Sequence, residues 1–233
     1  MSRIVMRPLW RELLFLHWPV EAQVLAPLLP PGLEVDTFNG QAYIGLVPFI
    51  MKNSRPSWMP NIGLRHLTDD FAEINVRTYV RFKGENPGVW FFSLAAASLP
   101  AVIAARLWFK LPYFWARMHT RTRGRYHSRR IWPRPTPARC RLKYSIEEEE
   151  PWVATKGSLE EFLVERYLLY SRRGGELFRG RVAHEPYRLQ RAQVLALQET
   201  LVARAGVQVL GAPPLCHFSR GVDVSVLPLE HVR

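Results

Sequence analysis

The chain has 233 residues, a formal net charge of +12 and an apolar fraction of 48%. This length suits one enzyme-sized domain, and the apolar fraction excludes intrinsic disorder, so we expect a single domain over residues 1–233. The excess of positive charge favours anionic partners, namely nucleic acid, membrane headgroups or small organic acids. Cys140 and Cys216 lie far apart and form no CxxC pair, which indicates a reducing, cytoplasmic location.

The N-terminal third is predicted to hold a helix, two strands and a loop. Residues 1–19 have only a short apolar run and no small-residue cleavage site, which argues against a secretory signal. Apolar residues recur at helical spacing over 19–29, before the Pro-Pro-Gly at 30–32. Residues 33–52 are predicted as two strands around Asn39-Gly40, a pair that favours a tight turn. The prolines and glycine of 53–68 predict a long loop.

Residues 71–84 alternate strictly between apolar and polar side chains, which predicts a strand. Glu73, Asn75, Arg77 and Tyr79 share one face of this strand, and Ile74 and its apolar neighbours share the other. The polar face has two interpretations. It can be solvated, or in a closed barrel it can line an interior cavity.

The uncharged residues 88–105 are long enough to span a bilayer. The first half is aromatic and strand-like, whereas Ser98 followed by Pro100 is typical of a helix start. We therefore predict a strand followed by a helix, and no membrane span.

Two basic segments follow. Arg121, Arg123 and Arg125 share one face of a predicted strand, and the next segment places Arg139, Arg141 and Lys143 together. The proline-rich link at 133–137 would let the two segments pair as a hairpin. No acidic residue occurs between Glu85 and Glu147. With Tyr126 and Trp132 interleaved, the hairpin over 117–143 motivates a nucleic-acid-binding module as one competing function class.

The C-terminal third is predicted to alternate helices and strands. Residues 158–175 carry a capping-box signature, Ser158 with Glu161, and an apolar stripe typical of a helix. Residues 177–184 are predicted as a strand, 194–206 as a helix and 222–228 as a closing strand.

Motifs for phosphate loops, a nucleophilic serine elbow and metal-ligand spacing do not occur in the sequence. We therefore expect neither a metal nor an organic cofactor.

Five segments in order resemble the uncharacterised YqjF-like family, a distant relative of acetoacetate decarboxylase. They are "LPPGLEVDTFNGQAYIGLVPFIM" (29–51), "FAEINVRTYV" (71–80), "ARLWFKLPYFWARM" (105–118), "FLVERYLLY" (162–170) and "HFSRGVDV" (217–224). The resemblance implies a mainly β (α+β) fold: a closed antiparallel β-barrel with a few peripheral helices and a small-molecule cavity. It also implies that the chain can form homo-oligomers.

The decarboxylases carry two adjacent lysines, one forming a Schiff base and the other lowering its pKa. The matching positions here are Tyr113 and Phe114, and Leu107 stands at the position of a glutamate. Lys110 lies three residues before the nucleophile position and has no cationic neighbour in the sequence, so we interpret it as structural. Imine chemistry would therefore be lost.

Glu73 matches the active-site glutamate strand of these relatives. Paired with Arg77 it would be structural, whereas a desolvated Glu73 with a raised pKa could act as a general acid or base. The resemblance thus suggests a protein that binds a small organic anion or carbonyl compound, or alternatively a lyase or isomerase that forms no imine. The candidate catalytic residues are Glu73 and Tyr113, and the candidate ligand-binding residues are Glu73, Asn75, Arg77, Arg106 and Tyr113.

Overall fold

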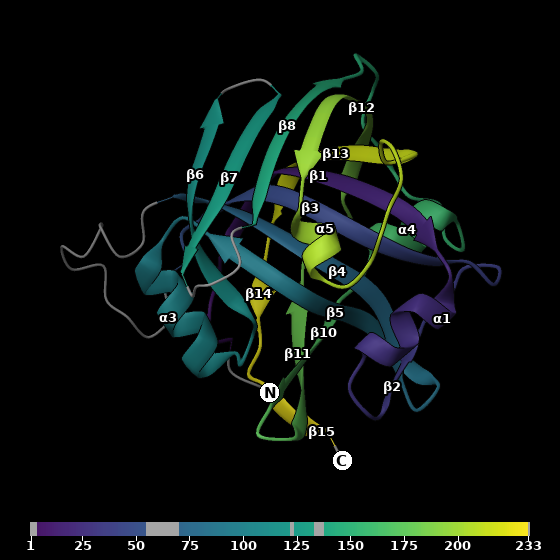
Figure 1. Cartoon of the computed structure of the whole chain (residues 1–233), viewed down its shortest axis with the longest axis vertical. Helices are drawn as coiled ribbons and strands as arrows, with labels where there is room; N and C mark the ends of the chain where they lie inside the picture. The colour runs from purple at the N-terminus through teal and green to yellow at the C-terminus, as the bar shows by residue number, and fades with distance from the viewer. Residues whose placement is uncertain (1–3, 55–69, 122–123, 133–137, 233) are drawn as a thin grey trace.

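The computed structural model describes residues 4–54, 70–121, 124–132 and 138–232, and most of these residues lie in β-strands (Figure 1). The strands are β1 Leu9–Val20, β2 Leu33–Val35, β3 Ala42–Lys52, β4 Phe71–Phe82, β5 Glu85–Ala96, β6 Tyr113–Arg121, β7 Arg125–Trp132, β8 Arg139–Ile146, β9 Trp152–Val153, β10 Leu168–Arg173, β11 Glu176–Ala183, β12 Arg188–Glu199, β13 Leu215–Asp223, β14 Ser225–Val226 and β15 Glu230–Val232. The helices are α1 Ala22–Leu25, the 3-10 turn η1 Ala26–Leu28, α3 Leu99–Trp108, α4 Leu159–Val164 and α5 Leu201–Arg204. The prediction of a mainly β chain is confirmed.

Strand pairing runs through a first circuit that returns to its start. From β5 it passes through β6, β7, β8, β12, β13, β1, β3 and β4, and β4 pairs with β5 again. Alternate side chains of these strands meet in one hydrophobic core, which includes Leu16, Ile44, Ile74 and Phe218. This core is therefore built from one face of every strand in the circuit.

A second circuit shares β1, β3, β4 and β5 with the first. The start of β5 pairs in parallel with β10, β10 pairs with β11, and β11 pairs with β14. Val226 of β14 then forms an antiparallel bridge with Met6, just before β1. A second hydrophobic core, with Phe15, Val47 and Tyr79, fills this side and is completed by residues of α3 and α4.

Because the shared strands have a core on each side, both faces of β4 are buried. Glu73 is 2% exposed, Asn75 6%, Arg77 9% and Tyr79 0%. The polar face of β4 lies with the second core, on the opposite side of the strand from Ile74 and Val76. The solvated interpretation of this face is therefore wrong.

The local signals around α3 and Asn39-Gly40 are confirmed in detail. The Ser98 hydroxyl accepts a hydrogen bond from Ala101 N at 3.4 Å and caps α3, as the Ser-Pro pattern predicts. Asn39 and Gly40 both have positive φ, 50° and 83°, and the backbones of Phe38 and Gln41 hydrogen-bond across the turn. The strands on either side of this turn, β2 and β3, do not pair with each other. Both of them pair with β4 instead.

The helix predicted over 19–29 is present, shortened to α1 with η1 over 22–28, and the residues before it form the long strand β1 over 9–20. Two predictions of helix are wrong over much of their length. The helix predicted over 158–175 ends at Val164, and 168–173 is strand β10. The helix predicted over 194–206 is strand β12 up to Glu199, with only the short α5 beyond it. A short apolar run is compatible with the period of a helix and with that of a strand, and pairing with a neighbouring strand decides which of the two forms.

The basic segments form three strands instead of two. The chain turns at Gly124, so β6 pairs with β7, and β7 pairs with β8. Arg121 and Arg125 are therefore cross-strand partners and not neighbours along one strand. Arg123, the link at 133–137 and most of the loop predicted at 53–68 lie outside the described residues.

Residues 88–105 form strand β5 and helix α3, as predicted. Within the part of the chain that the structure describes, every helix is too short or too polar to cross a membrane.

Candidate functional site

A largely apolar cavity of about 700 Å³ lies under α3 and is bounded by segments from both ends of the chain. Its polar groups include the side chains of Glu73 and Tyr113. The apolar walls include Val5, Met6, Trp10, Met51, Phe71, Ala101, Ala104, Ala105, Trp108, Phe109, Leu111, Leu169, Val182, Val226 and Leu229. No lysine or arginine is among the described residues that line it.

Strand register brings Glu73 and Tyr113 together. Glu73 of β4 pairs with Ala96 of β5, and Tyr113 of β6 pairs with Leu94 on the other edge of β5. Tyr113 Oη lies 2.9 Å from each carboxylate oxygen of Glu73. The backbone is also fixed, because Tyr126 Oη reaches from the first core and donates to the carbonyl oxygen of Glu73 at 2.7 Å.

Burial sets the protonation of this pair. Desolvation raises the pKa of Glu73 to about 8, although the hydrogen bond from Tyr113 acts in the opposite direction. Desolvation, followed by the nearby Glu73 carboxylate, raises the pKa of Tyr113 well above its usual value, so the phenol stays protonated. At neutral pH most Glu73 side chains therefore carry a proton, and the group can act as an acid or a base close to pH 8.

Arg77 and Tyr79 serve a different part of the same face. Arg77 Nη2 donates to the carbonyl oxygen of Leu163 at 3.0 Å, and Tyr79 Oη donates to the same oxygen at 2.6 Å. This oxygen belongs to the last turn of α4, where carbonyl groups lack partners within the helix. Among the described residues Arg77 forms no ion pair with Glu73, so the sequence-based pairing of these two side chains is not present.

His17 completes the Tyr79 site. Burial, and then the charge of Arg77, lower the pKa of His17 well below its usual value, so the ring is neutral. Its Nε2 lies 2.7 Å from Tyr79 Oη. Because the Tyr79 hydroxyl proton goes to Leu163, we assign the proton of this contact to His17 Nε2.

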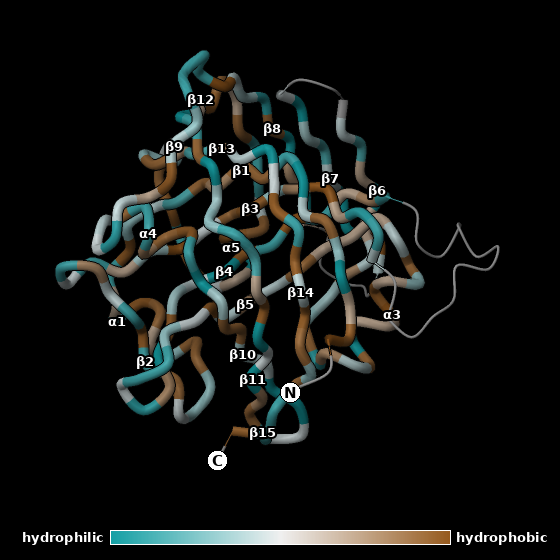
Figure 2. The backbone as a smooth tube through the Cα atoms, turned by 180° about the vertical axis from the view of Figure 1, so that it is seen from behind, coloured by the Kyte–Doolittle hydropathy of each residue, from teal (hydrophilic) through white to brown (hydrophobic). Residues whose placement is uncertain are grey.

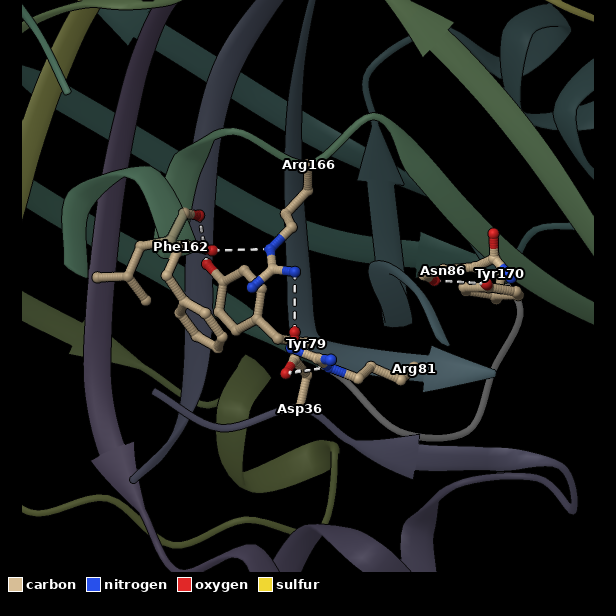
Figure 3. A network of polar contacts seen from close by, with 8 residues as sticks. Asp36, Tyr79, Arg81, Asn86, Phe162, Arg166 and Tyr170 are labelled. Atoms are coloured by element: carbon tan, nitrogen blue, oxygen red, sulfur yellow. Dashed lines mark hydrogen bonds and ion pairs between the residues drawn. The ribbon is translucent and has the colours of Figure 1, made fainter. Parts of the chain in front are cut away.

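A buried ion-pair network holds α4 and the following chain against β4 (Figure 3). Asp36 is 2% exposed and accepts from Arg81 Nε at 2.7 Å and from Arg166 Nη1 at 2.8 Å. The Arg166 guanidinium also packs 4.2 Å from the ring centroid of Phe162. Together with the hydrogen bonds from Arg77 and Tyr79 to Leu163, these contacts anchor α4 on the Arg77–Tyr79 half of β4, whereas the Glu73 half faces the cavity.

Two further candidates lie elsewhere. Asn75 is buried on the Glu73 face, but its Oδ1 atom has no hydrogen-bond partner among the described residues. Arg106 Nη1 donates to the carbonyl oxygen of Tyr113 at 2.7 Å, and its guanidinium lies 5.4 Å from the ring centroid of Trp132. Arg106 therefore supports the backbone of the site without lining the cavity. The structure brings Glu73 and Tyr113 together and leaves Arg77 and Arg106 outside the described cavity lining.

Lys110 follows the end of α3 with a positive φ of 55°. Its Nζ lies 3.1 Å from the ring centroid of Phe178 and does not line the Glu73 cavity. This placement agrees with a structural lysine.

Sequence reasoning missed the apolar walls, which come from the segment before β1, from α3 and from the C-terminal strands. The spacing of Ala101, Ala104 and Ala105 on one side of α3 was the signal available, because small side chains leave room beneath a helix. Among the described residues, no cluster of three or more histidine, cysteine or acidic side chains could hold a metal ion.

Comparisons with known proteins agree with this architecture. The chain is 38% identical over 230 residues to the uncharacterized protein YqjF of Bacillus subtilis (strain 168), covering 97% of this chain and 92% of that protein. Its structure resembles acetoacetate decarboxylase from Legionella pneumophila, with a TM-score of 0.64, 13% identity and coverage of 100% and 89% of the two chains. It also resembles the enduracididine biosynthesis enzyme MppR complexed with pyruvate, with a TM-score of 0.58, 12% identity and coverage of 99% and 91%.

At these identities the two solved structures show a shared fold and nothing more. The sequence relationship is stronger, and it confirms the resemblance to the YqjF-like family. A family model described as "Uncharacterized conserved protein" matches residues 7–223, so the chain belongs to the DUF2071 family.

Proposed function

We propose that this protein binds a small, mostly apolar carbonyl compound in the cavity at Glu73 and Tyr113. The observation that carries the proposal is the buried Glu73–Tyr113 pair within walls that are otherwise almost entirely hydrocarbon. A protonated Glu73 and the Tyr113 phenol offer hydrogen-bond donors to a carbonyl oxygen. A permanently charged small anion fits less well, because the described lining holds no cation to pair with it.

Two structural neighbours are consistent with a ketone at this place in the fold: one is named for decarboxylation of acetoacetate and the other is complexed with pyruvate, and both of these compounds carry a ketone. Both also carry a carboxylate, for which the described lining of this cavity holds no cation, so the likeness supports the ketone and not the acid group. We also propose that the first strand circuit closes as a β-barrel and that the ligand lies outside it, between the barrel and α3. The shared burial of β4 on both faces supports this arrangement.

The binding chemistry would not involve an imine. Tyr113 and Phe114 stand at the two lysine positions of the decarboxylase pattern, and Lys110 packs on Phe178. An imine needs a nucleophilic amine at the ligand, and none lines the described part of the cavity.

A second candidate function is proton transfer at the carbon next to the carbonyl group, as in an isomerase or a lyase. The raised pKa of Glu73, about 8, favours this candidate, because a base with a pKa near the working pH is an efficient proton acceptor. The ionised Glu73 would take the proton from the C–H bond, and the electron pair would move to the carbonyl oxygen as an enolate. Tyr113 would donate a hydrogen bond to that oxygen.

The two candidates are separated by Glu73→Gln, which keeps a neutral side chain of the same shape but cannot accept the proton. With 2-heptanone as the probe, binding is measured by calorimetry, and proton transfer by deuterium incorporation at the carbon next to the carbonyl group, followed by NMR. If the protein only binds the ketone, Glu73→Gln should retain the affinity of the wild type, and Glu73→Leu and Tyr113→Phe should weaken binding. If the protein also catalyses proton transfer, the wild type should in addition exchange deuterium into the ketone, and Glu73→Gln should abolish this exchange.

Glu34→Gln is the matched control, because Glu34 is exposed. If Glu73→Leu with Tyr113→Phe binds the ketone as the wild type does, the cavity is not the site. A borohydride-reduced adduct on Lys110 would overturn the non-imine chemistry.

A further inference from the structure

The outer faces of β6, β7 and β8 carry basic side chains in register. Strand pairing places Arg117 opposite Arg129 and Arg129 opposite Arg139. The next row is His119, His127 and Arg141, and in the third row Arg125 is opposite Lys143. Figure 1 shows the three strands side by side, with α3 beside the start of β6. Figure 2 shows hydrophilic and hydrophobic residues alternating along β8, as expected for a strand with one buried face.

This arrangement has little internal compensation. No acidic residue occurs between Glu85 and Glu147 in the sequence, and on the neighbouring strand β12 the residues next to Lys143 and Arg141 are Ala196 and Gln198. The rings of His119 and His127 lie 6.3 Å apart. Like charges stacked across strands repel one another, so an anion bound among them would relieve a cost that the free protein carries.

The basic side chains open onto a groove of about 1310 Å³ at the N-terminal end of α3. His119, Arg125, His127, Arg141 and Lys143 line it. Its acidic lining residue is Asp70, whose carboxylate lies 2.9 Å from Lys52 Nζ and so is already paired.

The groove and the Glu73 cavity are neighbours, because Phe71 and Pro100 line both of them. Strand β6 connects the two: on its outer face Tyr113 lies in the cavity, and His119 lies in the groove. Trp115 stands between these residues and donates from Nε1 to the carbonyl oxygen of Ala97 at 3.3 Å. Successive residues on one face of a strand are roughly 7 Å apart, so Tyr113 and His119, three such steps apart, are separated by roughly 20 Å along β6. A molecule that lies beside Phe71 and Pro100, which line both spaces, needs less than this length to enter both.

We propose that the ligand is an amphiphile with an apolar chain in the Glu73 cavity and a multiply charged headgroup of the phosphate class in the basic groove. The inference rests on the proposed function and extends it by naming the ligand class. Arginine and lysine provide charge-assisted hydrogen bonds to phosphate oxygens, and the apolar walls of the cavity suit a hydrocarbon chain.

A nucleic acid fits the same surface less well. Binding of single strands relies on exposed aromatic rings beside the basic groups. Tyr126 is only 6% exposed and points into the first core. Trp132 is 45% exposed, but it is not among the residues that line the groove, and the Arg106 guanidinium lies 5.4 Å from its ring centroid.

Decyl phosphate and decanol, which differ only in the phosphate, provide the test. Calorimetry is done below the micellar concentration of each compound and at several salt concentrations. We expect decyl phosphate to bind about tenfold more tightly than decanol at low salt, and the difference to shrink as salt rises. In Arg141→Gln/Lys143→Gln the difference should disappear while the affinity for decanol stays unchanged.

Lys156→Gln/Arg188→Gln is the matched control, since it removes the same charge at exposed positions outside the groove. The inference is overturned if decyl phosphate binds no more tightly than decanol, or if the groove variant loses no more affinity than the control. It is also overturned if a short oligonucleotide, but not decyl phosphate, binds in a way that depends on Arg141 and Lys143. Binding of 2-heptanone tests the cavity alone: if 2-heptanone fails to bind, the proposed function is at fault, whereas if 2-heptanone binds and decyl phosphate binds no more tightly than decanol, only the amphiphile inference fails.

Discussion

The phenol of Tyr113 meets both carboxylate oxygens of Glu73 at 2.9 Å, across 40 residues of sequence and inside an apolar cavity. Neither group has an ion-pair partner among the described residues, so burial dominates the titration of Glu73. At neutral pH both side chains are therefore uncharged and can donate hydrogen bonds. At higher pH Glu73 is ionised and can act as a base, while Tyr113 still donates a hydrogen bond to it.

The first prediction concerns the titration of this pair. The pKa of Glu73 is raised from 4.5 to about 8, and the hydrogen bond from Tyr113 lowers it. Removing that hydrogen bond in Tyr113→Phe should therefore raise the pKa of Glu73 further. Difference infrared spectroscopy of the carboxyl band over pH 5–10 measures both values, with Glu73→Gln identifying the band. An ionised band at pH 6 in the wild type would contradict the prediction.

The same shift predicts how stability depends on pH. The folded-state pKa of about 8 lies above the unfolded value, so the folded state binds the proton more tightly. The stabilising contribution of the protonated group is fully present below pH 4.5 and is lost as pH rises through about 8. We expect Glu73→Gln to be more stable than the wild type at pH 9 by about 2–4 kcal/mol, and close to it at pH 5. Urea denaturation at the two pH values checks this difference.

Filling the cavity should block ligand binding without unfolding the protein. Ala105 of α3 lines the cavity, and Ala105→Phe would place a ring in it at a cost of about 1–3 kcal/mol from overpacking. Ile103 lies on the same helix but is 48% exposed, so Ile103→Phe is the matched control. Calorimetry with 2-heptanone should show lost binding in the first variant only, with circular dichroism confirming that both are folded. Equal affinities in the two variants would place the ligand elsewhere.

The Asp36 network should contribute unequally to stability. Asp36→Asn leaves the buried Arg166 without its carboxylate, which should cost about 3–5 kcal/mol of unfolding free energy. Arg81, whose side chain is 47% exposed, contributes through a solvent-screened pair, so Arg81→Gln should cost about 0–1 kcal/mol. Denaturant titration of both variants tests the ranking, and equal losses would contradict it.

Alanine substitutions at Gly221 and Gly40 distinguish two causes of lost stability, a steric clash and backbone strain. Both have positive φ, 131° and 83°, but a Cβ at Gly221 would lie 2.0 Å from the carbonyl oxygen of Trp10, whereas a Cβ at Gly40 meets nothing within 4 Å. Gly40→Ala should cost about 1 kcal/mol from backbone strain alone. Gly221→Ala must also displace β1 from β13, so we expect it to be several times more destabilising, as measured by thermal unfolding. Similar melting temperatures for the two variants would contradict this account.

The sequence by itself determined the features that depend on local geometry. The alternation of β4, the Ser98 cap of α3 and the turn at Asn39-Gly40 follow from side-chain period, a capping hydroxyl and a preference for positive φ. The polar face that carries Glu73 was identified for the same reason, and Glu73 and Tyr113 were named together through the family resemblance.

Only the tertiary structure decided what each face meets. Whether residues 168–173 and 194–199 are strands depended on β5, β11 and β8, which supply the backbone hydrogen bonds that a helical stretch would make within itself. The division of β4 into a cavity half and an α4-bound half arose because its polar face packs against elements distant in sequence, including α3, α4 and β14. The burial of Glu73 results from many contacts with residues distant in sequence. It raises the pKa of Glu73, and the residues next to Glu73 in the sequence could not have predicted this shift.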